Sequence, residues 1–258
     1  MSSLSSRLVA SPCCLPRHSL AELYPAYREL GFEKFEGFST WAAAAHDWRG
    51  DAGAAREEAR RHGFEITSFH LPPITDDSGE SYENALAAAR FAARLGAGVI
   101  LFKARRRELF ADAGRRLLDA IGSEGLGLEL ALQNHKGSSI TTLDDYRDVF
   151  ARMGHDERVK AVLEVGHFQR VGISWRQGWE LLEGRIALIH VNEIREGRSV
   201  PYGTGEVDFA GLMKKIRESG YAGNIVVELE LDGAPPGETL RGLAAARTHL
   251  CSLYDQAL

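Results

Sequence analysis

The chain has 258 residues, 44% hydrophobic and 26% charged, enough for one large α/β domain or two small ones. Its net charge of −5 argues against a general nucleic-acid-binding protein, because phosphate binding depends on a positive surface. The three cysteines form neither a disulfide framework nor the paired spacing of a structural zinc site. No segment has the apolar length of a signal-peptide core or a membrane span, so we expect a cytoplasmic protein that contacts no membrane.

Short apolar runs alternate with longer amphipathic runs along the chain, which is the pattern of parallel strands joined by helices. In chain order, the predicted strands are 7–11, 34–38, 64–70, 99–103, 127–133, 161–165, 186–192 and 224–229. The predicted helices are 19–30, 51–62, 80–95, 109–123, one opening at Thr142 or Leu143, and then 174–182, 209–219 and 238–254. A glycine follows each of the first three helices, as is common at helix C-termini.

Eight strand–helix units without a Pro- or Ser-rich linker predict one domain. Strands this apolar fit a parallel sheet covered by helices. Eight units in about 250 residues is the usual size of a single-domain (β/α)8 TIM barrel. A doubly wound open sheet is the alternative, but no G-x-G-x-x-G turn supports a dinucleotide-binding fold of that type.

Nearly every predicted strand ends in a carboxylate, an imidazole, an amine or an amide. These residues are Glu36, His70, Lys103, Gln133, His135, Glu164, His167, His190, Glu193, Glu228 and Glu230. A single histidine at a strand end is more often structural than a ligand. The repetition of such residues on neighbouring strands is harder to explain in that way, because buried charges are costly unless they are paired or bound to a metal. At the carboxyl end of a barrel they therefore predict a divalent-ion site with open coordination positions.

Three stretches, VLEVGHFQRVG, LIHVNEIREGRSVPYGTGEVDF and YAGNIVVELE, resemble the sugar-phosphate isomerase/epimerase superfamily of xylose-isomerase-like barrels. Upstream, GFEKFEGF and SFHLPP resemble its second- and third-strand signatures. The resemblance covers essentially the whole chain and implies a single domain over residues 1–258. It also implies one divalent metal ion (Mn, Mg, Co, Zn or Fe), with ligands at Gln133, Glu164, His190 and Glu228.

The resemblance and the strand-end pattern together suggest roles for further residues. We expect Glu228 to be the base. His135, Lys136, His167 or Glu193 would supply a second acid/base group, with His135 and His167 as the preferred catalytic candidates. The expected substrate-binding residues are Glu36, His70, Lys103, Glu193 and Arg195, with Arg198 as the alternative to Arg195.

Gln133 departs from the family pattern, in which strand five carries a glutamate. An amide oxygen can coordinate a metal but cannot act as a general base. In relatives that epimerise or isomerise ketoses, the carboxylates of strands five and eight shuttle a proton at carbon. Gln133 thus argues against a two-glutamate epimerase, whereas Glu164 in place of the family's aspartate keeps the ligand charge on a longer stem.

These features predict a divalent-metal-dependent isomerase or epimerase that abstracts a proton beside the carbonyl of a sugar, keto-sugar or cyclitol. The alternatives are a lyase, dehydratase or keto-glycoside-cleaving enzyme on the same site, and a catalytically inactive sugar-binding barrel. An abasic-site endonuclease shares this fold but would need more metal ligands and a basic face. The expected partner is a small carbohydrate and no nucleic acid, and a homodimer is expected because such barrels often pair.

Aromatic side chains stack on the apolar faces of sugars, so the tryptophans are candidates for a sugar pocket. Trp41 directly follows the predicted strand 34–38 and is the best placed of them. Trp175 and Trp179 lie four residues apart in a predicted helix, where packing is the expected role.

Overall fold

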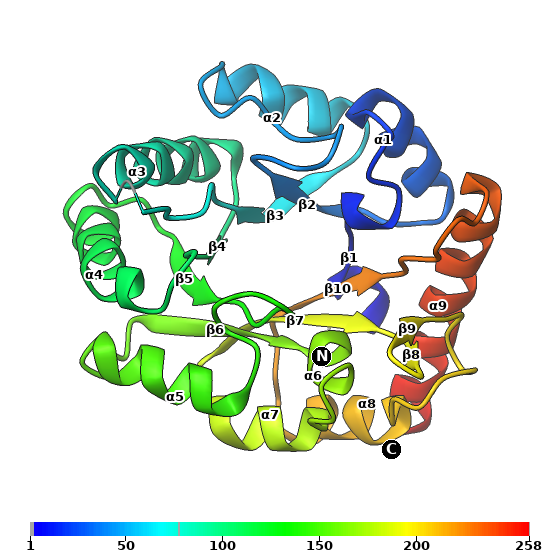
Figure 1. Ribbon diagram of the computed structural model, residues 1–258. Helices are drawn as coiled ribbons and strands as arrows, with labels where there is room; N and C mark the ends of the chain where they lie inside the picture. Colours follow the sequence, from blue (N-terminus) through cyan, green and yellow to red (C-terminus); the bar gives the residue numbers. More distant parts are fainter. Residues whose placement is uncertain (1–2, 77, 258) are drawn as a thin grey trace.

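A computed structural model describes residues 3–76 and 78–257. Eight parallel strands close into a barrel in the order β1-β10-β7-β6-β5-β4-β3-β2 (Figure 1). They are β1 (Leu8–Ala10), β2 (Lys34–Phe38), β3 (Glu65–His70), β4 (Val99–Phe102), β5 (Glu129–Leu132), β6 (Val159–Glu164), β7 (Ile186–Asn192) and β10 (Asn224–Glu228). The predicted TIM barrel is confirmed, and the closed sheet excludes the doubly wound alternative.

Helices surround the barrel on its outer side (Figure 1). The longer ones are α1 (Leu20–Glu29), α2 (Ala52–Arg61), α3 (Ser78–Leu95), α4 (Glu108–Ser123), α5 (Leu143–Arg152), α7 (Trp175–Leu182), α8 (Phe209–Glu218) and α9 (Pro236–Gln256). Each lies within a few residues of its predicted range. Within the described part of the chain, no helix is both long and apolar enough to cross a membrane.

Several short elements were not predicted. The helix α6 (Val165–Gln169) begins directly after β6, and β8 (Ile194–Arg195) pairs with β9 (Arg198–Ser199) in a small antiparallel hairpin. Two 3-10 turns, η1 (Leu4–Arg7) and η2 (Pro12–Cys14), flank the short β1. All of them are too short to show a hydrophobic period, so no periodicity could have indicated them.

The core has two layers that determine which strand residues face the barrel axis. A small inner cluster contains Val9, Val99, Leu101, Ala131, Val162, Leu188 and Val226, and a larger outer cluster lies between the strands and the helices. Side chains alternate along a strand with a period of two. The residues two positions after Ala131, Val162, Leu188 and Val226 therefore point to the axis at the carboxyl end, and they are Gln133, Glu164, His190 and Glu228.

Candidate active site

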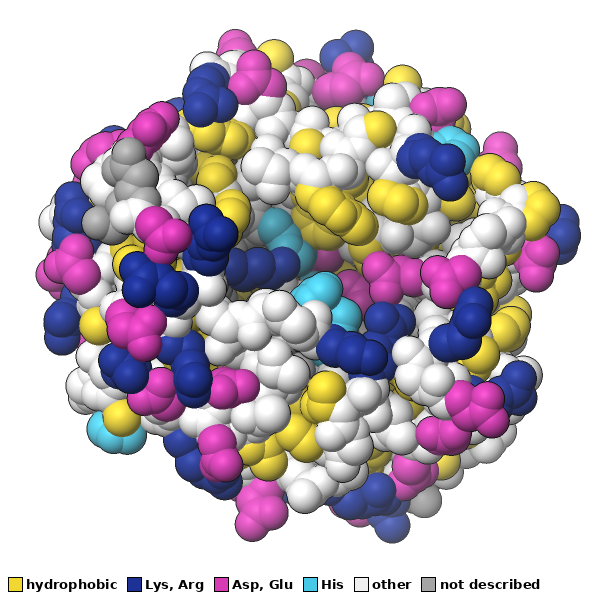
Figure 2. Space-filling view, viewed as in Figure 1, with side chains coloured by type: hydrophobic (Ala, Val, Ile, Leu, Met, Phe, Trp, Pro, Cys, Tyr) yellow, Lys and Arg dark blue, Asp and Glu magenta, His cyan; other side chains and the backbone are white. Residues whose placement is uncertain are grey.

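The carboxyl end of the barrel is hollowed at its centre, where basic, acidic and histidine side chains gather (Figure 2). A cavity of about 360 Å³ lies there, which is within the size range of small-molecule sites. Its lining includes six polar side chains at or just after the ends of five strands: His70, Lys103, Gln133, His135, His167 and Glu228. The structure thus brings together most of the site residues predicted from the sequence.

At the floor of this cavity four polar side chains converge on one another. Nδ1 of His190 lies 3.0 Å from Oε2 of Glu164 and 3.1 Å from Oε1 of Glu228. The Gln133 amide donates a hydrogen bond of 2.7 Å to the same Oε2 of Glu164. All four residues are buried, and ligand atoms of Glu164, His190 and Glu228 lie within 4.8 Å of one another.

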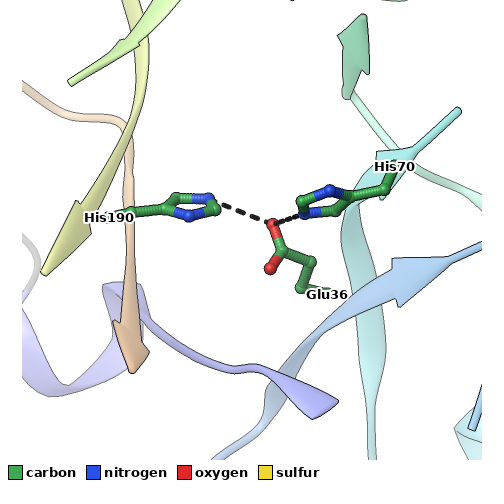
Figure 3. Close-up of side chains that lie close together, drawn as sticks. All are labelled: Glu36, His70 and His190. Atoms are coloured by element: carbon green, nitrogen blue, oxygen red, sulfur yellow. Dashed lines mark ion pairs between the residues drawn. The ribbon is translucent and has the colours of Figure 1, made fainter. Parts of the chain in front are cut away.

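The opposite edge of the His190 ring faces a second carboxylate. Oε1 of Glu36 lies between two imidazoles, 3.1 Å from Nε2 of His190 and 3.2 Å from Nε2 of His70 (Figure 3). Glu36 is completely buried and also accepts hydrogen bonds from the hydroxyls of Ser11 (3.0 Å) and Ser68 (3.1 Å). A histidine ligand held in this way by an outer carboxylate has a defined ring orientation.

The charges of this cluster depend strongly on one another. Burial disfavours charge on His190, but the carboxylates of Glu36 and Glu164 raise its pKa well above the usual value. Burial likewise opposes ionisation of Glu36 and Glu164, yet the charge on His190 holds the pKa of Glu36 well below its usual range and lowers that of Glu164 to about 2. Without a metal, His190 is therefore an imidazolium between two carboxylates.

Glu228 differs from the other carboxylates of the cluster. Burial and the nearby negative charge of Glu164 raise the pKa of Glu228 to about 8. It also borders the cavity, whereas Glu36 lies behind the histidines. Glu228 is thus an exchangeable proton site that faces the space in which a ligand would lie.

On the β3–β4 side of the cavity, Nζ of Lys103 lies 3.3 Å from Nδ1 of His70. Burial lowers the pKa of His70 to about 4, so the ring is neutral and Nδ1 can accept a hydrogen bond from the ammonium. Burial also lowers the pKa of Lys103. His70 therefore connects Lys103, on the cavity wall, to Glu36 behind it.

Two neighbouring imidazoles, tilted relative to each other, form another wall. The ring centroids of His135 and His167 are 3.8 Å apart, and the backbone amide of Lys136 donates to Nδ1 of His167 at 3.3 Å. Burial lowers the pKa of His167 to about 4 and also lowers that of His135. Both rings are therefore neutral at physiological pH, and the accepting Nδ1 of His167 leaves the proton on its Nε2.

Helix α5 holds the strand ends beside Gln133 in place. The hydroxyl of the buried Tyr146 accepts a hydrogen bond from the backbone amide of Asn134 at 2.9 Å. It also lies 3.2 Å from the carbonyl oxygen of Leu132 and 3.0 Å from that of Val162. One side chain of the outer layer thus links the carboxyl ends of β5 and β6, where Gln133 and Glu164 lie.

The cluster fits a divalent metal ion. Oε1 of Gln133 and Oε1 of Glu164 are buried, and neither has a hydrogen-bond partner among the described residues. Leaving such atoms unpaired is costly, and oxygen and imidazole donors suit Mg, Mn, Co, Zn or Fe. Gln133, Glu164, His190 and Glu228 would hold the ion, and the cavity would leave coordination positions open to a ligand.

Three of the predicted substrate-binding residues do not line the cavity. Glu36 lies behind His70 and His190, as described above. The carboxylate of Glu193 accepts hydrogen bonds from the backbone amides of Gly203 (3.1 Å) and Val207 (3.2 Å), and Arg195 is exposed and donates to the carbonyl of Thr204. A direct contact of these residues with substrate stays a prediction.

Other residues at the site were not predicted. Ser11 and Ser68, which hold Glu36, carried no sequence signal beyond their positions near the ends of predicted strands. Glu230 lines the cavity and lies 3.5 Å from Arg170, which follows α6. Glu230 was visible as a strand-end carboxylate, but its pairing with Arg170 depends on the unpredicted helix.

The comparisons with known proteins agree with this fold. A protein-family model described as xylose isomerase-like TIM barrel matches residues 25–249. An inosose dehydratase of Lacticaseibacillus casei is 26% identical over 129 residues, and the match spans 42% of this chain and 43% of that relative. The chain therefore covers less than half of the length of that curated relative.

Solved structures share the fold over nearly the whole chain. A xylose isomerase domain protein from Alicyclobacillus acidocaldarius superposes with a TM-score of 0.79 at 18% identity, covering 97% of this chain and 99% of that one. An L-ribulose 3-epimerase gives 0.77 at 16% identity, covering 98% and 95%. An IOLI protein with a bound zinc atom gives 0.74 at 13% identity, covering 98% and 99%.

Likenesses at such low identity establish the fold, and the family-model match over residues 25–249 adds the family. A closed barrel is also what that family's description leads one to expect. The chain belongs to the family of xylose isomerase-like TIM barrels.

Proposed function

We propose that this protein is a divalent-metal-dependent enzyme that removes a proton from the carbon beside the carbonyl of a keto-sugar or cyclitol. The proposal rests mainly on the placement of Glu228, which borders the cavity next to three further candidate metal ligands. The similarity to an inosose dehydratase and the fold shared with an L-ribulose 3-epimerase support the substrate class. The zinc atom of the IOLI structure supports the metal requirement.

The residues divide the chemistry between two walls of the cavity. A bound divalent ion would act as a Lewis acid that polarises the substrate carbonyl. Glu228 accepts the proton from carbon, because it is the carboxylate of the cluster that faces the cavity. The neighbouring imidazoles of His135 and His167 are placed to donate a hydrogen bond to an oxygen atom of the substrate.

Gln133 decides which reaction outcome the site favours. A two-base epimerisation needs a proton acceptor on each face of the carbon, and the Gln133 amide is not one. Elimination of water needs only one base, because the proton that Glu228 takes from carbon can pass to the leaving hydroxyl, and a hydrogen bond from the imidazole pair would support the departing oxygen. We therefore favour a dehydratase. Isomerisation or epimerisation is the second candidate, and it would require His135 or His167 to gain a proton before returning one to carbon.

Hydrogen exchange at carbon tests the proposal without knowledge of the product. The Mn-loaded protein is incubated with inosose, L-ribulose and D-tagatose in deuterium oxide, and proton NMR follows both deuterium uptake beside the carbonyl and dehydration. We expect exchange with at least one ketone, and we expect Glu228→Gln to slow it by about 10²- to 10⁴-fold. Glu180→Gln, the same change on the exposed face of α7, is the control.

The outcomes separate the three functional classes. Dehydration with exchange supports the favoured reaction, and exchange with a ketose product supports the second candidate. A protein that binds metal but exchanges no ketone, with Glu228→Gln indistinguishable from the parent, would instead be an inactive sugar-binding barrel.

A further inference from the structure

A second cavity adjoins the one that holds the candidate metal site. Its volume is about 510 Å³, and it lies between the segment after β1 and the segment after β10. The two cavities share Cys13, Trp41 and Glu230 in their linings. They are therefore neighbouring spaces, and a ligand that fills the inner cavity can extend past Trp41 into the outer one.

Trp41 has two unusual properties at this boundary. Its side chain is 67% exposed, whereas Trp48, Trp175 and Trp179 are 5% to 9% exposed. Its backbone has a φ of 79°, in the left-handed region that a bulky residue rarely adopts. Such backbone strain persists when the surroundings enforce it, and it is concentrated at ligand-binding positions.

The surroundings of Trp41 supply that constraint. The Trp41 ring packs edge-to-face on Phe38 with 5.7 Å between centroids, and Phe38 packs on His70 at 4.1 Å. The backbone amide of Ala43 donates to the carbonyl of Pro16 at 2.8 Å, which ties this segment to the one after β1. A continuous aromatic row thus runs outward from the candidate metal site and ends in an exposed indole.

The outer cavity combines apolar and polar groups in the way a sugar ring requires. Leu15, Pro16 and Leu231 provide apolar surface, and Arg17, His18 and Asp232 provide polar groups. Nδ1 of His18 is buried and has no hydrogen-bond partner among the residues that the structure describes. A ligand hydroxyl would satisfy it, while the indole of Trp41 offers a flat face for the C–H groups of a ring.

We propose that the outer cavity is a second subsite and that the substrate is a glycoside or other two-ring conjugate rather than a free monosaccharide. The ring that carries the carbonyl lies in the inner cavity, and the second ring lies against Trp41. The assignment of the reacting ring rests on the proposed function. The existence of the outer subsite rests on three observations: the residues shared by the two cavity linings, the exposed indole of Trp41, and the positive φ of the Trp41 backbone.

Matched ligand pairs test the subsite by binding rather than by turnover. The affinities of the Mn-loaded protein are measured by calorimetry for D-glucose against cellobiose and for D-xylose against xylobiose. We expect the two-ring member of at least one pair to bind about tenfold more tightly, which is the scale of one well-placed aromatic contact. We also expect it, and not the one-ring member, to protect tryptophan fluorescence from acrylamide, because Trp41 is the exposed indole.

Two variants make the test specific to Trp41. Trp41→Ala is expected to bring the affinity ratio of the pair close to one while metal affinity stays as in the parent. Trp48→Phe, a change at a buried tryptophan, is expected to keep the ratio. Equal affinities within both pairs, a ratio that survives in Trp41→Ala, or no binding of either disaccharide up to its solubility would overturn the proposal. So would an altered oligomeric mass of Trp41→Ala, which would place the indole in a contact between copies.

Failure here is distinguishable from failure of the proposed function. A protein that exchanges deuterium into a ketone but does not discriminate within the pairs keeps its enzymatic function and loses the second subsite. A protein that discriminates within the pairs but never exchanges keeps the subsite as part of a sugar-binding barrel.

Discussion

Nε2 of His190 lies 3.1 Å from Glu36, while Nδ1 of the same ring lies 3.0 Å from Glu164. Nε2 therefore faces Glu36, whereas Nδ1 faces Glu164 and also Glu228 at 3.1 Å. At this distance the Glu36 carboxylate favours a proton on Nε2, and we expect it to orient the ring. Nδ1 would be the nitrogen of His190 that holds a metal ion.

Glu36→Gln should therefore weaken metal binding although residue 36 is not a ligand. The amide keeps one oxygen acceptor at nearly the same volume, so we expect the fold to persist, and we expect metal affinity to fall by about 10- to 100-fold. Calorimetric titration with Mn and circular dichroism measure the two effects. Glu65→Gln, on the exposed start of β3, is the control. An unchanged affinity in Glu36→Gln would show that Glu36 does not orient His190.

Gln133→Glu should bind metal more tightly than the parent, and Gln133→Ala should bind it less tightly. The carboxylate adds one negative charge to the ligand set, whereas alanine removes a ligand. The same glutamate would face Glu164, which now accepts a 2.7 Å hydrogen bond from the amide. We therefore also expect the metal-free Gln133→Glu protein to melt at a lower temperature than the parent, since like charges repel in a buried site.

Thermal melts with and without metal check both parts of that prediction. Gln256→Glu near the end of α9 makes the same change of charge far from the cluster and should leave both melts unaltered. If neither substitution at position 133 changes metal affinity, the residue lies outside the metal site.

Metal binding should release protons. His190 has a raised pKa and Glu228 one of about 8, so both hold a proton at about pH 7 in the metal-free protein, and a metal would displace it. We expect about one to two protons per ion and an affinity that falls as the pH is lowered. Calorimetry in buffers of different ionisation enthalpy counts the protons. A value near zero would mean that the cluster is already deprotonated.

His46 should make the fold less stable in acid. Its ring packs near Phe69 and Phe91, and burial lowers its pKa from 6.5 to about 4. Between these values the unfolded chain binds the proton and the folded chain does not, so stability decreases as the pH falls through this window. The decrease from His46 alone reaches about 3 kcal/mol at its lower end.

Urea unfolding at about pH 8 and about pH 5 measures the size of that loss. In His46→Phe the difference between the two values should shrink, whatever the substitution does to packing at either pH. His155→Gln removes an exposed imidazole and should leave the difference as in the parent. A parent-like difference in His46→Phe would assign the acid sensitivity to other groups.

The barrel was predictable because it follows from local patterns, whereas the candidate ligand set came from the family resemblance. Apolar runs ending in polar residues located the strands, and in the structure the period of two along each strand places Glu164, His190 and Glu228 at the axis. The hydrogen-bond partners of Glu36 were not predictable, since Ser11 and Ser68 come from other strands and look ordinary in sequence.

The outer cavity was equally inaccessible to sequence reasoning. Trp41 was expected near a pocket because it follows a strand, and the structure places it on the cavity lining. Its exposure and its positive φ, however, result from the packing of its loop against the segment after β1, a long-range contact without a local signature.

Through Tyr146, the packing of the outer helix α5 affects the positions of side chains at the candidate metal site. Its hydroxyl joins the ends of β5 and β6, so a change in how α5 packs would shift the Gln133 and Glu164 side chains relative to each other. Substitutions on a surface helix could thereby retune metal preference while every ligand stays the same. Divergence within such a barrel can then proceed from the periphery inward, and comparing ligand residues alone would miss it.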